Sequence, residues 1–94
     1  MRVEWHPLAR TDLAELVTYI ATGSPEAAYR IHDEIRRQIG MLAMHPAMGR
    51  IGRVPGTREL VIAGTPFIAA YRVTRDLVMI LRLLHGARRW PGTL

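Results

Sequence analysis

The chain has 94 residues, of which 13 are basic and eight acidic, so its formal net charge is +5. All of the basic residues are arginines, and the absence of cysteine excludes disulfides and zinc–thiolate sites. No apolar run is long enough to span a bilayer, so we expect a single cytoplasmic domain over residues 1–94. The excess positive charge indicates an acidic partner, either nucleic acid or a negatively charged protein segment.

The N-terminal half predicts a short strand followed by two helices. Apolar and polar residues alternate over residues 2–6, which is typical of a strand. Apolar residues then recur at helical spacing over residues 7–21 and again over residues 25–44. Ser24 and Pro25 suit the N-cap and the first turn of the second helix. The helices should form an antiparallel hairpin, with a buried stripe of Leu13, Leu16, Ile20, Ile31, Ile35 and Ile39.

The C-terminal half predicts three sequential strands. Residues 57–62, 67–74 and 77–85 are rich in β-branched, aromatic and long aliphatic side chains, and short turns separate them. Strands joined by such turns form an antiparallel meander. The predicted fold class is therefore α+β, with an antiparallel β-sheet packed on the N-terminal α-helical hairpin. The N-terminal strand and the three-stranded C-terminal meander would make up this sheet.

Several arginines and one histidine interrupt the apolar strands. An arginine is costly to bury alone, so these residues indicate either ion pairs or a partly wet face of the sheet. A histidine acting as general acid or base, with arginines that stabilise a developing phosphorane, is the minimum for metal-free RNA cleavage. The alternative is structural: the histidine caps its strand, and the arginines pair with Glu4, Glu59 and a partner. The candidate catalytic residues are Arg58, Arg72, Arg82 and His85.

Two registers are possible for the hairpin between the last two strands. A two-residue turn at positions 75–76 would place Arg72 on the same face as Met79 and His85. A three-residue turn would place Arg72 with Arg82 instead, because a slip of one residue exchanges the faces of a strand. The sequence leaves both registers open, and with them the question of which arginines share a face with His85.

No pattern indicates a metal ion or a cofactor, and we expect neither. The four histidines show no i, i+4 pairing on a helix and have no cysteine to assist them. The glycine-rich loop over residues 46–56 lacks the Lys-Ser/Thr pair of a phosphate-binding P-loop. Any chemistry would therefore depend on the arginine–histidine group.

Short motifs along almost the whole chain carry a family resemblance. They are Trp5-His-Pro-Leu-Ala-Arg-Thr-Asp-Leu13, Ala27-Ala28, Leu42-Ala-Met-His-Pro46, Met48-Gly-Arg50, Arg58-Glu-Leu60, Tyr71-Arg-Val73 and Leu81-Arg-Leu-Leu-His-Gly-Ala-Arg88. In this order they resemble the ParE/RelE superfamily of bacterial toxins. The resemblance implies the toxin of a type II toxin–antitoxin module, which arrests growth and is neutralised by a cognate antitoxin. It also implies that a C-terminal antitoxin segment, disordered when free, wraps the toxin.

The superfamily uses two mechanisms, and the resemblance extends to both. RelE-like members are ribosome-dependent mRNA endonucleases, and the residues that match their basic site are Arg53 or Arg58, Arg72, Arg82 and His85. ParE-like members inhibit DNA gyrase and need no nuclease site. The chain lacks the lysines common in RelE proper and the usual catalytic tyrosine, and its long second helix resembles the ParE branch. We therefore favour gyrase inhibition, with mRNA cleavage as the alternative. A second alternative is a non-toxic, antitoxin-binding module in operon autoregulation.

Five arginines, with Arg58 again among them, and one tryptophan are expected to bind partners. A chain of this length is near the lower limit for burying an adequate core, so a bound antitoxin would supply buried area. We expect the antitoxin to lay apolar side chains on the toxin and acidic ones near the arginines of the glycine-rich loop and the next strand. For a gyrase inhibitor, the basic tail should contribute to toxicity. The predicted partner-binding residues are Arg50, Arg53, Arg58, Arg88, Arg89 and Trp90.

Overall fold

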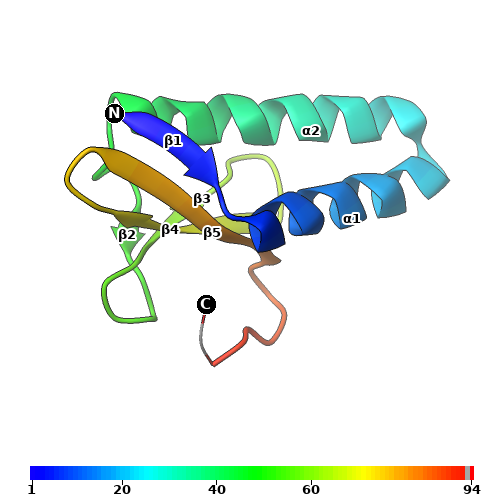
Figure 1. Ribbon diagram of the computed structural model, residues 1–94. Coiled ribbons are helices and arrows are strands. Elements are labelled where there is room, and N and C mark those ends of the chain that lie inside the picture. The colour runs from blue at the N-terminus through cyan, green and yellow to red at the C-terminus, as the bar shows by residue number, and fades with distance from the viewer. Residues whose placement is uncertain (93) are drawn as a thin grey trace.

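The computed structural model describes residues 1–92 and residue 94. Figure 1 shows a helical hairpin lying over a β-sheet, with the tip of the hairpin projecting beyond it. The helices are α1 (Pro7–Gly23) and α2 (Pro25–Gly40), and α2 continues into a 3₁₀ turn, η1 (Met41–Ala43). The strands are β1 (Arg2–Trp5), β2 (Arg50–Ile51), β3 (Arg58–Val61), β4 (Phe67–Val73) and β5 (Leu77–His85). No helix of the described residues has both the length and the apolar character needed to cross a membrane.

Each helix begins at a side chain that caps it. The Nδ1 atom of His6 accepts a hydrogen bond from the N–H of Leu8 at 3.1 Å. The Oγ atom of Ser24 accepts one from the N–H of Ala27 at 3.1 Å, as expected for an N-cap serine. The two helices are confirmed, but α2 ends at Gly40, whereas the prediction ran to residue 44. The chain tightens there into 3₁₀ geometry, a frequent ending of α-helices.

The sheet has five strands in the order β1-β5-β4-β3-β2. The antiparallel meander of β3, β4 and β5 is confirmed. The sheet as a whole is mixed rather than antiparallel, because β1 pairs with β5 in parallel, with Trp5 opposite Ile80. The helical hairpin and the strands β2, β3 and β4 lie between β1 and β5 along the chain, so no tight turn dictates the relative direction of these two strands. The edge strand β2 is not among the predicted strands, and its two residues are too few for a recognisable strand pattern.

The turn between β4 and β5 follows the two-residue alternative. The N–H of Thr74 donates to the carbonyl oxygen of Leu77 at 2.9 Å, which leaves two residues in the turn. Arg72 lies opposite Met79, as that alternative predicts.

A β-bulge farther along the hairpin changes the face that His85 occupies. Residues 80 and 82 of β5 lie opposite the neighbouring β4 residues 71 and 70, so Leu81 is an extra residue. All later side chains of β5 therefore exchange faces relative to a regular ladder. His85 lies opposite Phe67 on the face covered by the helices. Arg72 points to the opposite side, here called the open face, so the two-residue alternative is right about Met79 and wrong about His85.

The hydrophobic core lies between the hairpin and the helix-covered face. Of the predicted core residues, Leu13, Ile35 and Ile39 are buried, and Leu16 and Ile31 are partly buried against the same cluster. The remaining one, Ile20, is half-buried at the edge of a groove described below. The sheet contributes the buried side chains of Leu60, Ala69, Tyr71, Val78, Ile80 and Leu83, and Ile62, directly after β3, adds another.

Tyr71 connects this core to the loop before β2. Its hydroxyl group donates to the carbonyl oxygen of Pro46 at 2.8 Å and accepts from the N–H of Gly49 at 2.8 Å. Burial raises the pKa of Tyr71, which keeps the side chain neutral. A Cβ atom at position 49 would lie 2.6 Å from the hydroxyl oxygen, so only glycine fits there. The loop is thereby tied to the sheet just before Arg50 and Arg53.

Candidate functional site

Glu59 of β3 is a buried carboxylate on the open face, with a side chain that is 2% exposed. Its Oε1 atom accepts hydrogen bonds from Nε and Nη2 of Arg50 at 3.3 and 3.0 Å, and from Nη2 of Arg53 at 3.1 Å. Its Oε2 atom accepts from the backbone N–H and the Nε of Arg53 at 2.8 and 3.0 Å. Burial alone would raise the pKa of Glu59, but the hydrogen bonds from Arg53 and Arg50 lower it to about 2. Glu59 is therefore ionised at neutral pH.

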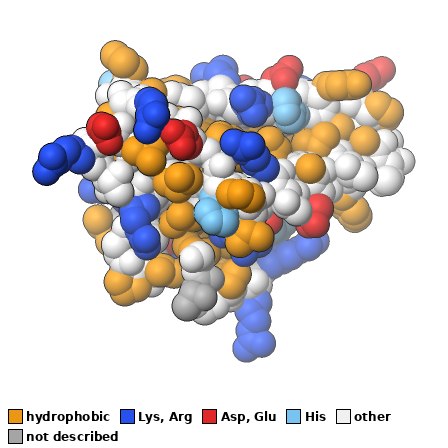
Figure 2. All heavy atoms as spheres, in the orientation of Figure 1, with side chains coloured by type: hydrophobic (Ala, Val, Ile, Leu, Met, Phe, Trp, Pro, Cys, Tyr) orange, Lys and Arg blue, Asp and Glu red, His pale blue; other side chains and the backbone are white. Residues whose placement is uncertain are grey.

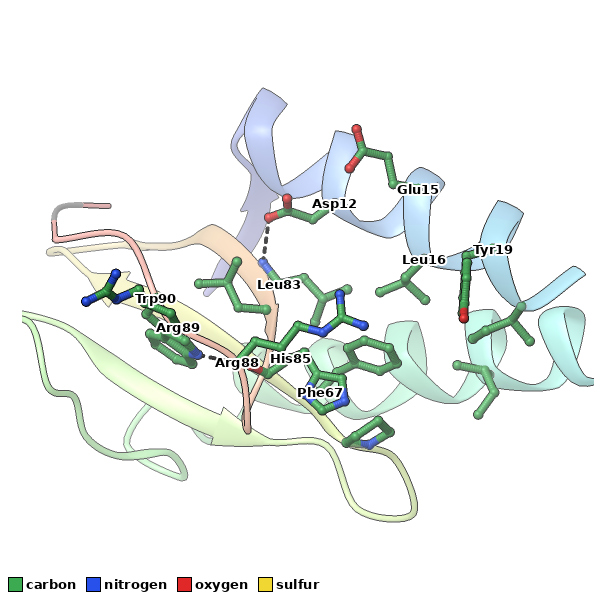
Figure 3. Close-up of a pocket in the computed structure, with 14 residues that line it drawn as sticks. Asp12, Glu15, Leu16, Tyr19, Phe67, Leu83, His85, Arg88, Arg89 and Trp90 are labelled. Atoms are coloured by element: carbon green, nitrogen blue, oxygen red, sulfur yellow. Dashed lines mark hydrogen bonds between the residues drawn. The ribbon is translucent and has the colours of Figure 1, made fainter. Parts of the chain in front are cut away.

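The C-terminal tail, residues 86–92, folds back to this cluster. The guanidinium carbon of Arg53 lies 3.6 Å from the ring centroid of Trp90, which is a close cation–π stack. The indole N–H of Trp90 donates to the carbonyl oxygen of His85 at 3.2 Å (Figure 3). The backbone N–H of Arg88 donates to the same carbonyl at 3.1 Å. These two hydrogen bonds to the carbonyl oxygen of His85, at the end of β5, hold the tail in a turn.

A groove of about 670 Å³ opens between α1, the end of β5 and the tail. Its apolar lining includes Leu16, Phe67 and Leu83, and Tyr19 stands at its α1 side (Figure 3). The side chain of Arg88 extends from the tail towards Phe67 (Figure 3). A hollow that combines an apolar lining with charged groups at its rim suits an amphipathic protein segment.

Arg82 is engaged in an ion pair beside this groove. Its Nε and Nη2 atoms donate to the two carboxylate oxygens of Asp12 at 2.8 and 3.0 Å, and the N–H of Leu83 donates to Asp12 Oδ2 at 2.9 Å. The pairing with Asp12 raises the pKa of Arg82. Strand β1 ends opposite Ile80 and does not pair with Leu83, so the carboxylate of Asp12 accepts the hydrogen bond from the Leu83 N–H instead. Sequence reasoning missed Asp12, although its i, i+4 spacing to Leu16 indicates that both lie on one helix face.

The four predicted catalytic residues are not brought together. Arg58 points to the helix-covered side of β3, and its Nη1 atom donates to the carbonyl oxygen of Gly49 at 2.7 Å. Arg72 is exposed on the open face, where its Nε atom lies 3.5 Å from the carbonyl oxygen of Gly56. Of the four residues, His85 lines the groove. Within the described part of the chain, no three metal-ligating side chains gather.

His85 has the contacts expected of a strand cap. Its Nδ1 atom accepts a hydrogen bond from the N–H of Ala87 at 3.2 Å, so the neutral ring carries its proton on Nε2. The ring meets Phe67 edge to face, with centroids 5.7 Å apart and an interplanar angle of 82°. Both contacts agree with the structural alternative for this residue.

Four of the five predicted partner-binding arginines fall into two groups, and the fifth, Arg58, is bonded to Gly49 as described above. Arg50 and Arg53 share the carboxylate of Glu59, so this cluster keeps one positive charge. Arg88 and Arg89 are exposed, and among the described residues neither forms a salt bridge. Figure 2 shows basic side chains projecting on the side of the molecule where Figure 1 draws the tail. The tail arginines can therefore meet an acidic group of a partner.

Comparisons with known proteins identify the family. Residues 3–90 match the model of a family described as the ParE toxin of the type II toxin–antitoxin system parDE. The chain is 42% identical over 93 residues to the putative toxin Y4kP of Sinorhizobium fredii, covering 99% of this chain and 96% of that protein. It is 36% identical over 87 residues to the toxin RelE2 of Caulobacter vibrioides, covering 93% and 97% of the two chains.

A solved structure shares the fold as well as the sequence. A chain of the chromosomal ParDE system from P. aeruginosa matches with a TM-score of 0.79 and 31% identity, over 88% of this chain and 92% of that one. The sequence and the fold therefore lead to the same conclusion. This protein belongs to the ParE toxin family of type II toxin–antitoxin systems, within the ParE/RelE superfamily.

Proposed function

We propose that this toxin arrests growth by inhibiting DNA gyrase, as the ParE-like branch does, rather than by cutting messenger RNA. The observation that supports this proposal is the separation of His85 from the arginines that would have to act with it. A gyrase inhibitor needs a binding surface and transfers no proton, so such a separation would not impair it.

Metal-free RNA cleavage makes a strict geometric demand. The general base, the general acid and the stabilising cation must all reach one phosphodiester at hydrogen-bond distance. Phe67, which lies opposite His85, is five residues from Arg72 along β4, which corresponds to about 16 Å. The side chains of His85 and Arg72 also point to opposite faces of the sheet. One phosphate group cannot contact both.

The other two candidate arginines are already engaged within the fold. Arg82 holds Asp12 through two hydrogen bonds, and Arg58 donates to a backbone carbonyl. If a phosphate recruited Arg82, the carboxylate of Asp12, which is 12% exposed, would lose its positively charged partner. Leaving a buried charge unpaired is costly, which disfavours a role for Arg82 in catalysis.

A binding surface for the target is available elsewhere on the molecule. Tyr19 and Tyr29 are 75% and 73% exposed on the two helices, and Arg88 and Arg89 are exposed on the tail. Tyrosine and arginine are enriched at the energetic centres of protein interfaces. These four side chains are our candidates for the contact with gyrase.

The antitoxin is the second partner in this proposal. We expect its apolar side chains to enter the groove at Leu16 and Phe67, and its acidic side chains to lie near Arg50, Arg53 and Arg58. A partner at a concentration 1,000 times its Kd stabilises the folded state by about 4 kcal/mol, so co-purified antitoxin should raise the Tm of the toxin clearly. Leu16→Asp should lower that gain. A toxin whose Tm is unchanged by its co-encoded antitoxin would contradict the pairing.

The mechanism is tested with two readouts measured side by side, gyrase supercoiling and ribosome-dependent mRNA cleavage. His85→Gln should retain most of the inhibition of supercoiling and of growth, whereas the double variant Arg88→Ala/Arg89→Ala should lose most of both. Arg75→Ala is a matched control, because it removes one exposed arginine in the β4–β5 turn, at the far end of β5 from the tail.

Cleavage of mRNA is the second candidate function, because one of the similar proteins is named toxin RelE2. If the wild-type toxin cleaves message, and His85→Gln lowers that activity by about 10²–10⁴-fold, the gyrase proposal is wrong. A wild-type protein that binds antitoxin but changes neither readout would support the autoregulatory module instead.

A further inference from the structure

A continuous chain of contacts leads from a buried carboxylate to the exposed tail. Glu59 binds Arg53, Arg53 stacks on Trp90, and Trp90 is held by the carbonyl at the end of β5. The first and last of these contacts are local, and the stack of Arg53 on Trp90 joins segments that are distant in the sequence. The position of the tail therefore depends on residues of the loop before β3 and of β3 itself.

Glu59 fixes the plane of the Arg53 guanidinium. It accepts three hydrogen bonds from Arg53: from the backbone N–H, the Nε and the Nη2. Hydrogen bonds from both the main chain and the planar fork leave the Arg53 side chain little rotational freedom. One face of the guanidinium can then serve as a flat platform for the indole of Trp90, 3.6 Å away. Arg50 binds the same carboxylate through Oε1.

Trp90 in turn fixes the residues that precede it. Its indole N–H and the backbone N–H of Arg88 both donate to the carbonyl oxygen of His85. Docking of the indole therefore closes a short loop that contains Arg88 and Arg89. Figure 3 shows the Arg88 side chain directed towards the groove from this loop. Without the stack, a terminal segment of this length would sample many conformations.

We propose that Glu59 and Arg53 are positioning residues for the C-terminal tail. By holding the platform for Trp90, they set where Arg88 and Arg89 meet the cellular target. The link to the target rests on the proposed function, which assigns target binding to the tail. A buried ion pair contributes little net stability compared with apolar residues, which agrees with a role in positioning.

The first test follows the tail itself. In a Trp5→Phe background Trp90 is the single tryptophan, so acrylamide quenching of its fluorescence reports whether the indole is docked. Arg53→Lys keeps the charge and removes the planar platform. The ratio of docked to undocked tail should fall about twofold to thirtyfold, the range that a lost cation–π contact implies, and quenching should rise. Glu59→Gln should act in the same direction.

Arg50→Ala is the control, because it removes a donor to Glu59 without removing the platform. Its quenching should equal that of the parent protein. Unchanged quenching in Arg53→Lys would overturn the proposal, as would an equal rise in Arg50→Ala. If Glu59→Gln fails to fold, Arg53→Lys still decides the matter, because Arg53 is 44% exposed and its replacement does not disturb the core.

The second test separates this proposal from the proposed function. Arg53→Lys should weaken inhibition of gyrase supercoiling, with no further loss when it is added to Arg88→Ala/Arg89→Ala, because both changes act through the tail. Additive losses would overturn the positioning role in inhibition. A tail that loosens while inhibition stays at the wild-type level would support positioning by Glu59 and Arg53. That result would show that the tail does not bind the target.

Discussion

The two faces of the sheet are held by different interactions. The helix-covered face is mainly apolar, and Ile80 and Leu83 of the sheet belong to one buried cluster with Ile35 and Ile39 of α2. The open face carries the ion-pair cluster around Glu59 and the returning C-terminal tail. One face is stabilised mainly by burial of apolar area, and the other by directed hydrogen bonds and a stacked ring.

The two kinds of interaction contribute differently to the stability of the fold and to the precision of its geometry. Apolar burial has no preferred direction, so it contributes most of the free energy of folding while tolerating small shifts. Charge-assisted hydrogen bonds contribute less net free energy but fix angles and distances. We therefore expect substitutions on the helix-covered face to change the stability most. Substitutions around Glu59 should change mainly the pH dependence and the position of the tail.

The largest expected effect is that of Ile35→Ala in the core. Ile35 is 0% exposed, so the truncation leaves a cavity and should lower the free energy of unfolding by about 2–5 kcal/mol. The denaturant midpoint measured by circular dichroism checks this value. Arg30→Ala, at an exposed position of the same helix, should change the free energy by less than about 0.5 kcal/mol. An unchanged midpoint for Ile35→Ala would contradict the assigned core.

The next effect in size concerns Glu59 and pH. The pKa of Glu59 in the folded state is about 2, below the ordinary value of 4.5. Ionised Glu59 therefore stabilises the fold fully above about pH 4.5, and this contribution is lost as the pH falls towards 2. The contribution is about 3 kcal/mol at most, and less because its arginine partners are half exposed and screened by salt.

The comparison of wild type with Glu59→Gln isolates this contribution. The difference between their free energies of unfolding, measured with urea, should be constant above pH 5 and should shrink steadily between pH 4.5 and 2. Other carboxylates titrate in both proteins and cancel. A difference that stays the same down to pH 2 would show that Glu59 is not held ionised by Arg50 and Arg53.

The smallest expected effect is that of Tyr71→Phe, which removes one hydroxyl from the apolar face. The carbonyl of Pro46 and the N–H of Gly49 would lose their partner, at a cost of about 1–2 kcal/mol. Thermal unfolding measures this loss. Tyr29→Phe removes a hydroxyl from an exposed tyrosine and should leave the Tm unchanged. Equal Tm values for all three proteins would show that the loop before β2 does not depend on Tyr71.

The features of this protein that depend on neighbouring residues could be predicted from local sequence patterns. Helical spacing and the capping Ser24 located the hairpin, and β-branched runs with short turns located the meander. The family resemblance came from motifs spread along almost the whole chain, and the comparisons confirm it. These signals are local, because capping and periodicity act within a few residues.

Contacts between distant segments become visible only in the folded protein. The parallel pairing of β1 with β5 joins the two ends of the fold, and the ion pair of Asp12 with Arg82 spans 70 residues. The bulge at Leu81 places His85 on the opposite face from Arg72, and no local residue preference predicts this bulge. The stack of Trp90 on Arg53 likewise depends on the return of the tail to the loop before β3. Such contacts form because the packed core brings these segments together, and a periodic pattern within one segment carries no information about its distant partner.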